Sequence, residues 1–98
     1  MFILPEECGH HIAVLENLLT KFGVKHQLYK LQEELDELWD EIDHTAEDEE
    51  PTDNLFSEMA DVIIMLEQMV MIYGSSRILE QIHFKLNRTR ERLNSGEI

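Results

Sequence analysis

Apolar residues recur at helical spacing along most of the chain. Residues 5–22 carry them at every third or fourth position, and Gly23 follows as a helix-stopping residue. Both this stretch and the next have the apolar stripe of a helix that packs against neighbours. In the second stretch, from Val24 to about Asp43, the stripe consists of Leu28, Leu31, Leu35, Leu38 and Ile42. The pattern therefore predicts helices over residues 5–22 and 24–43.

The second half of the chain predicts two further helices. Residues 45–53 combine like charges with a proline and are typical of a solvated connection. Residues 54–73 are apolar nearly all the way round and predict a third helix. A fourth helix extends to about Leu93, and either Ser75 or Ser76 is placed to cap its start.

The composition indicates the fold class, and the apolar surface of the third helix indicates an oligomer. Two prolines, four glycines and an abundance of Leu, Glu and Met favour an all-α protein. The third helix has no polar face and must be covered on every side, which its neighbours in so short a chain cannot do alone. We therefore expect a single domain over residues 1–98, a four-helix subunit of a homodimer or homotetramer. In an up-down bundle its fourth helix runs antiparallel to the third.

The net charge and the cysteine content narrow the range of possible binding partners and compartments. The net charge of −13, from 8 basic and 21 acidic residues, argues against a DNA or RNA polymer as partner. The single cysteine, Cys8, excludes an intrachain disulfide and fits the cytoplasm. The apolar start of the chain is too short for a signal peptide, and no apolar run reaches membrane-spanning length. We expect a cytoplasmic protein without a membrane partner.

Two acidic clusters lie on consecutive predicted helices. Glu58 and Asp61, one turn apart, interrupt the apolar third helix, where isolated anions are costly. Glu33, Glu34 and Glu37 occupy one arc of the second helix, away from its leucine stripe. The cluster on the second helix would by itself be typical of a solvated surface. The acids among apolar neighbours on the third helix change that interpretation.

Bringing the two clusters together requires a compensating charge. Each close pair of carboxylates repels by about 4 kcal/mol at an effective dielectric constant near 20. A divalent cation reverses the sign, and oxygen-only ligands favour Mg²⁺, with Mn²⁺ as the alternative ion. Because Mg²⁺ usually takes one or two protein carboxylates, five acids suggest two ions, or one ion and a carboxylate free to act as a base.

The motif Glu33-Glu34-x-x-Glu37, followed after twenty residues by Glu58-x-x-Asp61, resembles the signature of the MazG-like all-α nucleoside triphosphate pyrophosphohydrolases. The flanking sequence agrees, because residues 22–31 resemble the lead-in to the first motif and residues 60–64 resemble the continuation after the second. The resemblance spans residues 20–93, nearly the whole chain.

This resemblance implies a hydrolase that cleaves between the α and β phosphates of a standard or modified nucleoside triphosphate, using Mg²⁺ and releasing a nucleoside monophosphate and pyrophosphate. It makes Glu33 or Glu34, together with Glu37, Glu58 and Asp61, the candidate metal ligands. Glu34 is also the candidate to orient and deprotonate the attacking water. This is sound chemistry, because metal ions neutralise phosphate charge and lower the pKa of bound water.

Phosphates also need cations beyond the metal. Lys85, Arg88 and Arg92 share one face of the fourth helix, and Lys85 and Arg88 are the first candidates for phosphate binding and catalysis. The alternative is that the basic residues solubilise the helix end and complement its dipole. Lys30 either touches phosphate or forms an ordinary helical ion pair with Glu34.

The base and sugar need an aromatic or amide lining. Four residues are available for it: Gln27, Tyr29, Trp39 and Asn87. Trp39 lies at the edge of the leucine stripe and fits core or interface packing better than a stacking platform. The sequence does not indicate which base is preferred.

Two other interpretations compete with the hydrolase. An acidic helical protein without catalysis would bind a basic partner or imitate nucleic acid, but it has no use for Glu58 and Asp61 among apolar neighbours. A di-iron carboxylate bundle would use Glu7-x-x-His10 and Glu80-x-x-His83. In an up-down bundle these two motifs lie at opposite ends, which argues against a shared iron site.

Overall fold

The computed structural model describes residues 3–48 and 50–98, and every regular element in that part of the chain is a helix. The elements are the 3-10 helix η1 (Glu6–His11) and the α-helices α1 (Ile12–Phe22), α2 (Val24–Asp48), α3 (Asp53–Tyr73) and α4 (Ser76–Ser95). The predicted all-α class is confirmed. No described helix combines the length and the apolar character needed to cross a membrane.

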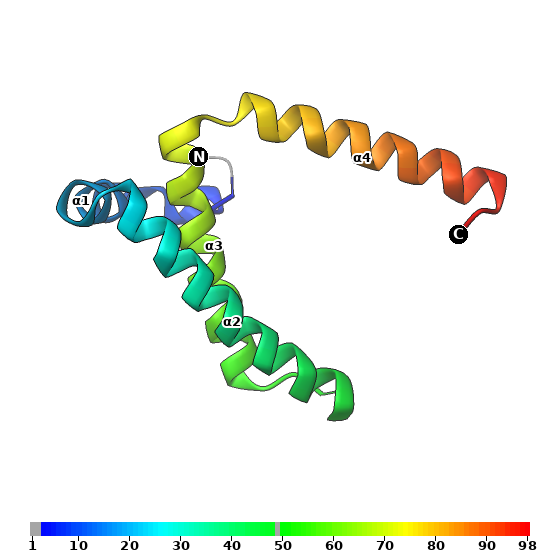
Figure 1. The fold of residues 1–98 in the computed structure, drawn as a ribbon, viewed down its shortest axis with the longest axis horizontal. Helices are drawn as coiled ribbons and strands as arrows, with labels where there is room; N and C mark the ends of the chain where they lie inside the picture. The colour runs from blue at the N-terminus through cyan, green and yellow to red at the C-terminus, as the bar shows by residue number, and fades with distance from the viewer. Residues whose placement is uncertain (1–2, 49) are drawn as a thin grey trace.

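Helices α2 and α3 pack side by side as an antiparallel hairpin that forms the body of the molecule (Figure 1). Helix α1 crosses one end of this hairpin, where α2 begins and α3 ends, and contacts both helices. The buried apolar side chains in the described chain are Leu15 of α1 and Val62, Met65, Met69 and Val70 of α3. This core is small for 98 residues and lies mainly at the end of the hairpin that α1 crosses.

Helix α4 leaves the body of the molecule (Figure 1). Within the described chain it packs against none of η1, α1, α2 or α3, and every residue from Leu79 onward is exposed. The expectation that the fourth helix runs antiparallel along the third within one subunit is therefore wrong. The apolar pattern of a helix shows that one face needs covering, but it does not show which surface provides the cover.

The acidic run does not end α2, which continues to Asp48. Alanine and glutamate are good helix formers. The helix-breaking residue of this stretch is Pro51, because a proline disfavours helical conformation in the residue before it. The predicted connection over residues 45–53 is therefore wrong for its first four residues. Glu49, also in that stretch, lies outside the described residues.

The ends of three helices follow from local chemistry. The predicted first α-helix starts as the 3-10 turn η1 and becomes α-helical only at Ile12, because Gly9 lowers helix propensity. The predicted bounds of α3 are confirmed within one residue, and the Thr52 hydroxyl caps it by accepting the Leu55 N–H at 3.1 Å. Ser75, one of the two predicted caps, occupies the N-cap position of α4, but its side chain makes no capping hydrogen bond.

Candidate functional site

Four carboxylates from the hairpin helices meet in one place. Glu34 and Glu37 of α2 and Glu58 and Asp61 of α3 each offer one oxygen, and these oxygens all lie within 4.8 Å of one another. Among the described residues, no other group of acids, histidines and cysteines has this geometry. We call these four residues the acidic quartet. It unites four of the five acids that the sequence put forward as metal ligands.

Helical spacing and antiparallel packing build the quartet. Glu34 and Glu37 are three residues apart, as are Glu58 and Asp61, so each pair lies on one face of its helix. Packing of α2 on α3 then brings the two pairs together. Glu34 is buried, Glu58 and Asp61 are half-buried and Glu37 is exposed. The quartet therefore extends from the helix interface to the solvent.

Two oxygens of the quartet are buried without a hydrogen-bond donor. Glu34 Oε2 and Glu58 Oε2 have no partner within the described residues. The other oxygen of Glu34 lies 3.2 Å from Lys30 Nζ. A buried carboxylate oxygen without a donor is costly, and such groups in native proteins commonly mark an ion or water site. The donor set therefore fits a hard divalent cation.

The crowding of carboxylates raises the pKa of two members. A hydrogen bond with Glu58, followed by the negative charge of Glu34, raises the pKa of Glu37 from 4.5 to about 7. Burial, followed by the charge of Glu34, raises the pKa of Asp61 above its ordinary value. A divalent cation would displace these protons on binding, because metal ligands must be deprotonated.

Glu33 lies outside the quartet. Its side chain is 66% exposed, and one of its oxygens lies 3.3 Å from Lys30 Nζ. Adjacent helix residues point about 100° apart, so Glu33 and Glu34 cannot both face α3. Of these two candidate ligands, Glu34 lies in the quartet and Glu33 does not.

Lys30 links Glu34 of the quartet to Glu33, which lies outside the quartet. It forms ion pairs with Glu33 at 3.3 Å and Glu34 at 3.2 Å, and hydrogen bonds to Glu34 and then Glu33 raise its pKa. The helical ion pair is therefore present. The Lys30 side chain is still 44% exposed, so a bound anion could also reach it.

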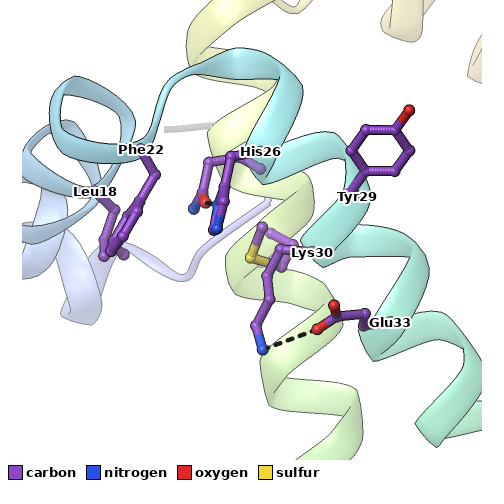
Figure 2. A pocket seen from close by; sticks show the side chains of 8 residues that line it. Leu18, Phe22, His26, Tyr29, Lys30 and Glu33 are labelled. Atoms are coloured by element: carbon purple, nitrogen blue, oxygen red, sulfur yellow. Dashed lines mark hydrogen bonds and ion pairs between the residues drawn. The ribbon is translucent and has the colours of Figure 1, made fainter.

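A pocket of about 500 Å³ opens beside Lys30 (Figure 2). Leu18 and Phe22 of α1, His26, Gln27, Tyr29, Lys30 and Glu33 of α2 and Met65 of α3 line it. The rings of Phe22 and His26 stack with their centroids 4.7 Å apart. The pocket thus combines an aromatic wall with a charged rim that reaches the quartet through Lys30.

Three buried polar side chains are Gln27, Gln68 and Glu67, and of these Gln27 lines the pocket. Gln27 Nε2 donates to Gln68 Oε1 at 2.8 Å, and His26 Nδ1 lies 2.8 Å from Gln27 Oε1. Gln68 is fully buried, and Glu67, 1% exposed, accepts the Ile3 N–H at 2.8 Å. No functional role follows from the sequence for His26, Glu67 or Gln68. For the last two the signal was present, since they too are polar residues in an apolar helix.

Of the remaining predicted site residues, some line the pocket and others lie outside it. Gln27 and Tyr29 line the pocket, whereas Trp39 is 68% exposed and does not. The structure places three candidates on α4, out of contact with α2 and α3: Lys85, Asn87 and Arg88. The expectation that α4 brings cations level with the acids of its own chain is therefore wrong, while the phosphate-binding role of these residues stays a prediction.

The residues of the di-iron alternative are not brought together in the described chain. Glu7 and His10 belong to η1, Glu80 and His83 belong to α4, and these two helices do not touch. Comparison with protein-family models, curated proteins and solved structures gave no match. The quartet and the pocket beside it therefore carry the functional inference.

Proposed function

We propose that this chain is a MazG-like, Mg²⁺-dependent nucleoside triphosphate pyrophosphohydrolase, with Mn²⁺ as the alternative ion. It would cleave the bond between the α and β phosphates and release a nucleoside monophosphate and pyrophosphate. The acidic quartet carries this proposal, because one carboxylate oxygen from each of its four residues lies within 4.8 Å of the others and two of its oxygens, Glu34 Oε2 and Glu58 Oε2, are buried without a donor. A merely solvated acidic surface would not bury them.

The members of the quartet would hold the metal, which when bound neutralises phosphate charge and lowers the pKa of a bound water. Glu58 and Glu34 contribute the donor-free buried oxygens. Lys30 holds Glu34 through Oε1, so its Oε2 remains available to accept a proton from water. We therefore keep Glu34 as the proposed general base, with Glu37 and Asp61 as ligands.

The pocket in Figure 2 would take the base and sugar. Phe22 and His26 offer a stacked aromatic wall, and Tyr29 and Lys30 offer hydrogen-bond donors at its edge. A nucleoside in this pocket would direct its phosphates past Lys30 toward the quartet. Trp39 lies outside the pocket and is not needed for this pose.

Pyrophosphate release from a panel of standard and modified nucleoside triphosphates with Mg²⁺ tests the proposal. Asp61→Asn should lower turnover by at least about a hundredfold, because a metal ligand is lost. The matched control is Asp36→Asn, which removes an exposed carboxylate of α2 outside the quartet and should retain activity. No pyrophosphate from any substrate, with thermal stability unchanged by Mg²⁺, would favour the acidic interaction protein.

A further inference from the structure

A chain of hydrogen bonds runs from the interior of α3 to the pocket of Figure 2. At its inner end Gln68 Nε2 donates to the Ile64 carbonyl oxygen and to Met65 Sδ, both at 3.4 Å. Gln68 Oε1 accepts from Gln27 Nε2, and Gln27 Oε1 lies 2.8 Å from His26 Nδ1. His26 lines the pocket, where the chain of bonds ends. We call the side chains of Gln68, Gln27 and His26 the amide relay.

The Ile64 carbonyl sets the direction of every hydrogen bond in the relay. Distances between nitrogen and oxygen atoms do not locate hydrogens, but a carbonyl oxygen can only accept. Gln68 must therefore turn its NH₂ group toward Ile64 and its oxygen toward Gln27. Gln27 in turn directs its NH₂ group to Gln68 and its oxygen to His26, so His26 Nδ1 carries a hydrogen and donates it. In neutral His26, Nε2 is then a pure acceptor.

Burial keeps the two amides from reversing. Gln68 is fully buried and Gln27 is 3% exposed, so water does not replace a lost partner, and an unpaired buried polar group is costly. The Phe22 ring stacks on the His26 imidazole, with 4.7 Å between centroids and 18° between the planes. Phe22 thus covers one face of the imidazole and Gln27 occupies Nδ1. Within the described chain, Nε2 is the ring nitrogen that remains for a ligand.

His26 lies where a bound nucleotide would place its base. His26, Lys30 and Glu37 project within about 40° of one another around α2. Glu34 of the quartet comes eight residues after His26, about 12 Å along the helix, and Lys30 lies halfway between them. A nucleoside triphosphate with its phosphates at the quartet would extend past Lys30 and bring its base, rather than its sugar, level with His26.

A pure acceptor at Nε2 discriminates among bases. Cytosine and adenine each carry an exocyclic amino group, which donates hydrogen bonds. Uracil and hypoxanthine carry a carbonyl oxygen at the same position, and this oxygen would face Nε2 as a second acceptor. The relay therefore favours amino-bearing bases over their deaminated counterparts, because the wrong base leaves two acceptors facing each other without a hydrogen.

We propose that His26, held in one tautomer by Gln27 and Gln68, accepts a hydrogen bond from the exocyclic amino group of the base. The enzyme would then hydrolyse cytidine or adenosine triphosphates faster than the matching uridine or inosine triphosphates. His26 contacts the base, whereas Gln27 and Gln68 are positioning residues that act through it. The selectivity rests on the proposed function, and the tautomer of His26 does not.

Rates on matched substrates test the selectivity. In whichever pair it accepts better, CTP with UTP or ATP with ITP, wild type should show at least about tenfold higher kcat/KM for the amino member. His26→Phe keeps an aromatic ring against Phe22 but removes the acceptor, and should lower that ratio by at least about fivefold. His44→Phe, the same substitution at an exposed position of α2 outside the pocket, should keep the wild-type ratio. Equal wild-type rates within both pairs, or a ratio unchanged by His26→Phe, would overturn the proposal.

Nitrogen-15 NMR of the histidine side chains tests the relay without any substrate. At about pH 8, where imidazole is neutral, His26 should show a protonated Nδ1 and a bare Nε2. Gln68 does not line the pocket, yet Gln68→Leu frees the Gln27 amide to reverse. That variant should shift His26 toward the mixed tautomers of free histidine and also lower the substrate ratio. Val70→Ala, a buried truncation of α3 outside the pocket, controls for lost stability and should leave His26 unchanged.

The two experiments separate the relay from the proposed function. A wild-type His26 with its hydrogen on Nε2, or an unchanged spectrum in Gln68→Leu, overturns the relay. If wild type hydrolyses triphosphates without favouring amino-bearing bases, the proposed function stands and the role of His26 fails. If wild type hydrolyses no triphosphate while His26 shows the fixed tautomer and loses it in Gln68→Leu, the proposed function fails and the relay stands.

Discussion

At the scale of single residues, Glu37 shows the effect of crowding four carboxylates together. Its pKa of about 7 means that the folded chain holds a proton there that the unfolded chain releases near 4.5. Without metal, the contribution of Glu37 to folding stability is therefore unfavourable above both values and absent below both. As pH rises from about 4.5 to about 7, the metal-free protein should lose stability through this group.

Urea unfolding in EDTA checks this at a series of pH values. Glu37→Gln should match wild type near pH 4 and become the more stable of the two as pH passes about 7. Glu47→Gln, an exposed position of α2 outside the quartet, should keep the wild-type profile. A constant difference between Glu37→Gln and wild type at every pH would contradict the shifted pKa.

Adding Mg²⁺ should reverse the order of stability of wild type and Glu37→Gln. Bound cation stabilises the folded state in proportion to its saturation, and only an intact quartet offers the full ligand set. At pH 8 wild type should gain thermal stability on adding Mg²⁺, while Glu37→Gln and Asp61→Asn should gain little. Equal gains in wild type and both variants would place the bound ion elsewhere on this acidic chain.

At the scale of helices, the hairpin of α2 and α3 depends on a buried amide pair as well as on apolar packing. Gln68→Leu would leave the Gln27 amide buried without its 2.8 Å partner, which should cost about 1–3 kcal/mol in the free energy of unfolding. Exposed Gln81→Leu on α4 is the control and should change it by less than about 0.5 kcal/mol. Urea titration of both variants measures the difference.

The single variant Gln27→Leu and the double variant Gln27→Leu, Gln68→Leu complete a double-mutant cycle with Gln68→Leu. If the two amides stabilise each other, the double variant should lose less stability than the sum of the two single variants. Simple additivity would show that each glutamine acts through other contacts, such as the 3.4 Å approach of Gln68 Nε2 to the Ile64 carbonyl.

At the scale of the whole molecule, the small core and the detached α4 lead us to expect that stability depends on association with a second copy of the chain. A dimer that buries the exposed apolar side chains of α4 should show a midpoint of thermal unfolding that rises by a few degrees for each tenfold increase in protein concentration. Leu86→Asp should abolish that dependence and lower the midpoint, whereas Phe84→Asp should preserve it. Scanning calorimetry at several concentrations checks both statements.

The sequence by itself determined the four helical segments, the all-α class and the two acidic clusters, because helical spacing and the cost of anions among apolar residues are local properties. Residues 54–73 were placed within one residue for this reason. The assignment of residues 45–48 to a connection is wrong, because the acidic residues and the proline of the stretch 45–53 suggest solvent although Ala46 and Glu47 favour helix.

Only the tertiary structure decided which residues meet. It selected Glu34 over its neighbour Glu33, because one face of α2 is turned to α3 and two adjacent side chains cannot share it. It also placed α4, with Lys85 and Arg88, away from the acids of its own chain. An apolar stripe specifies burial but not the surface that provides it, and that choice depends on contacts between segments distant in sequence or in another copy.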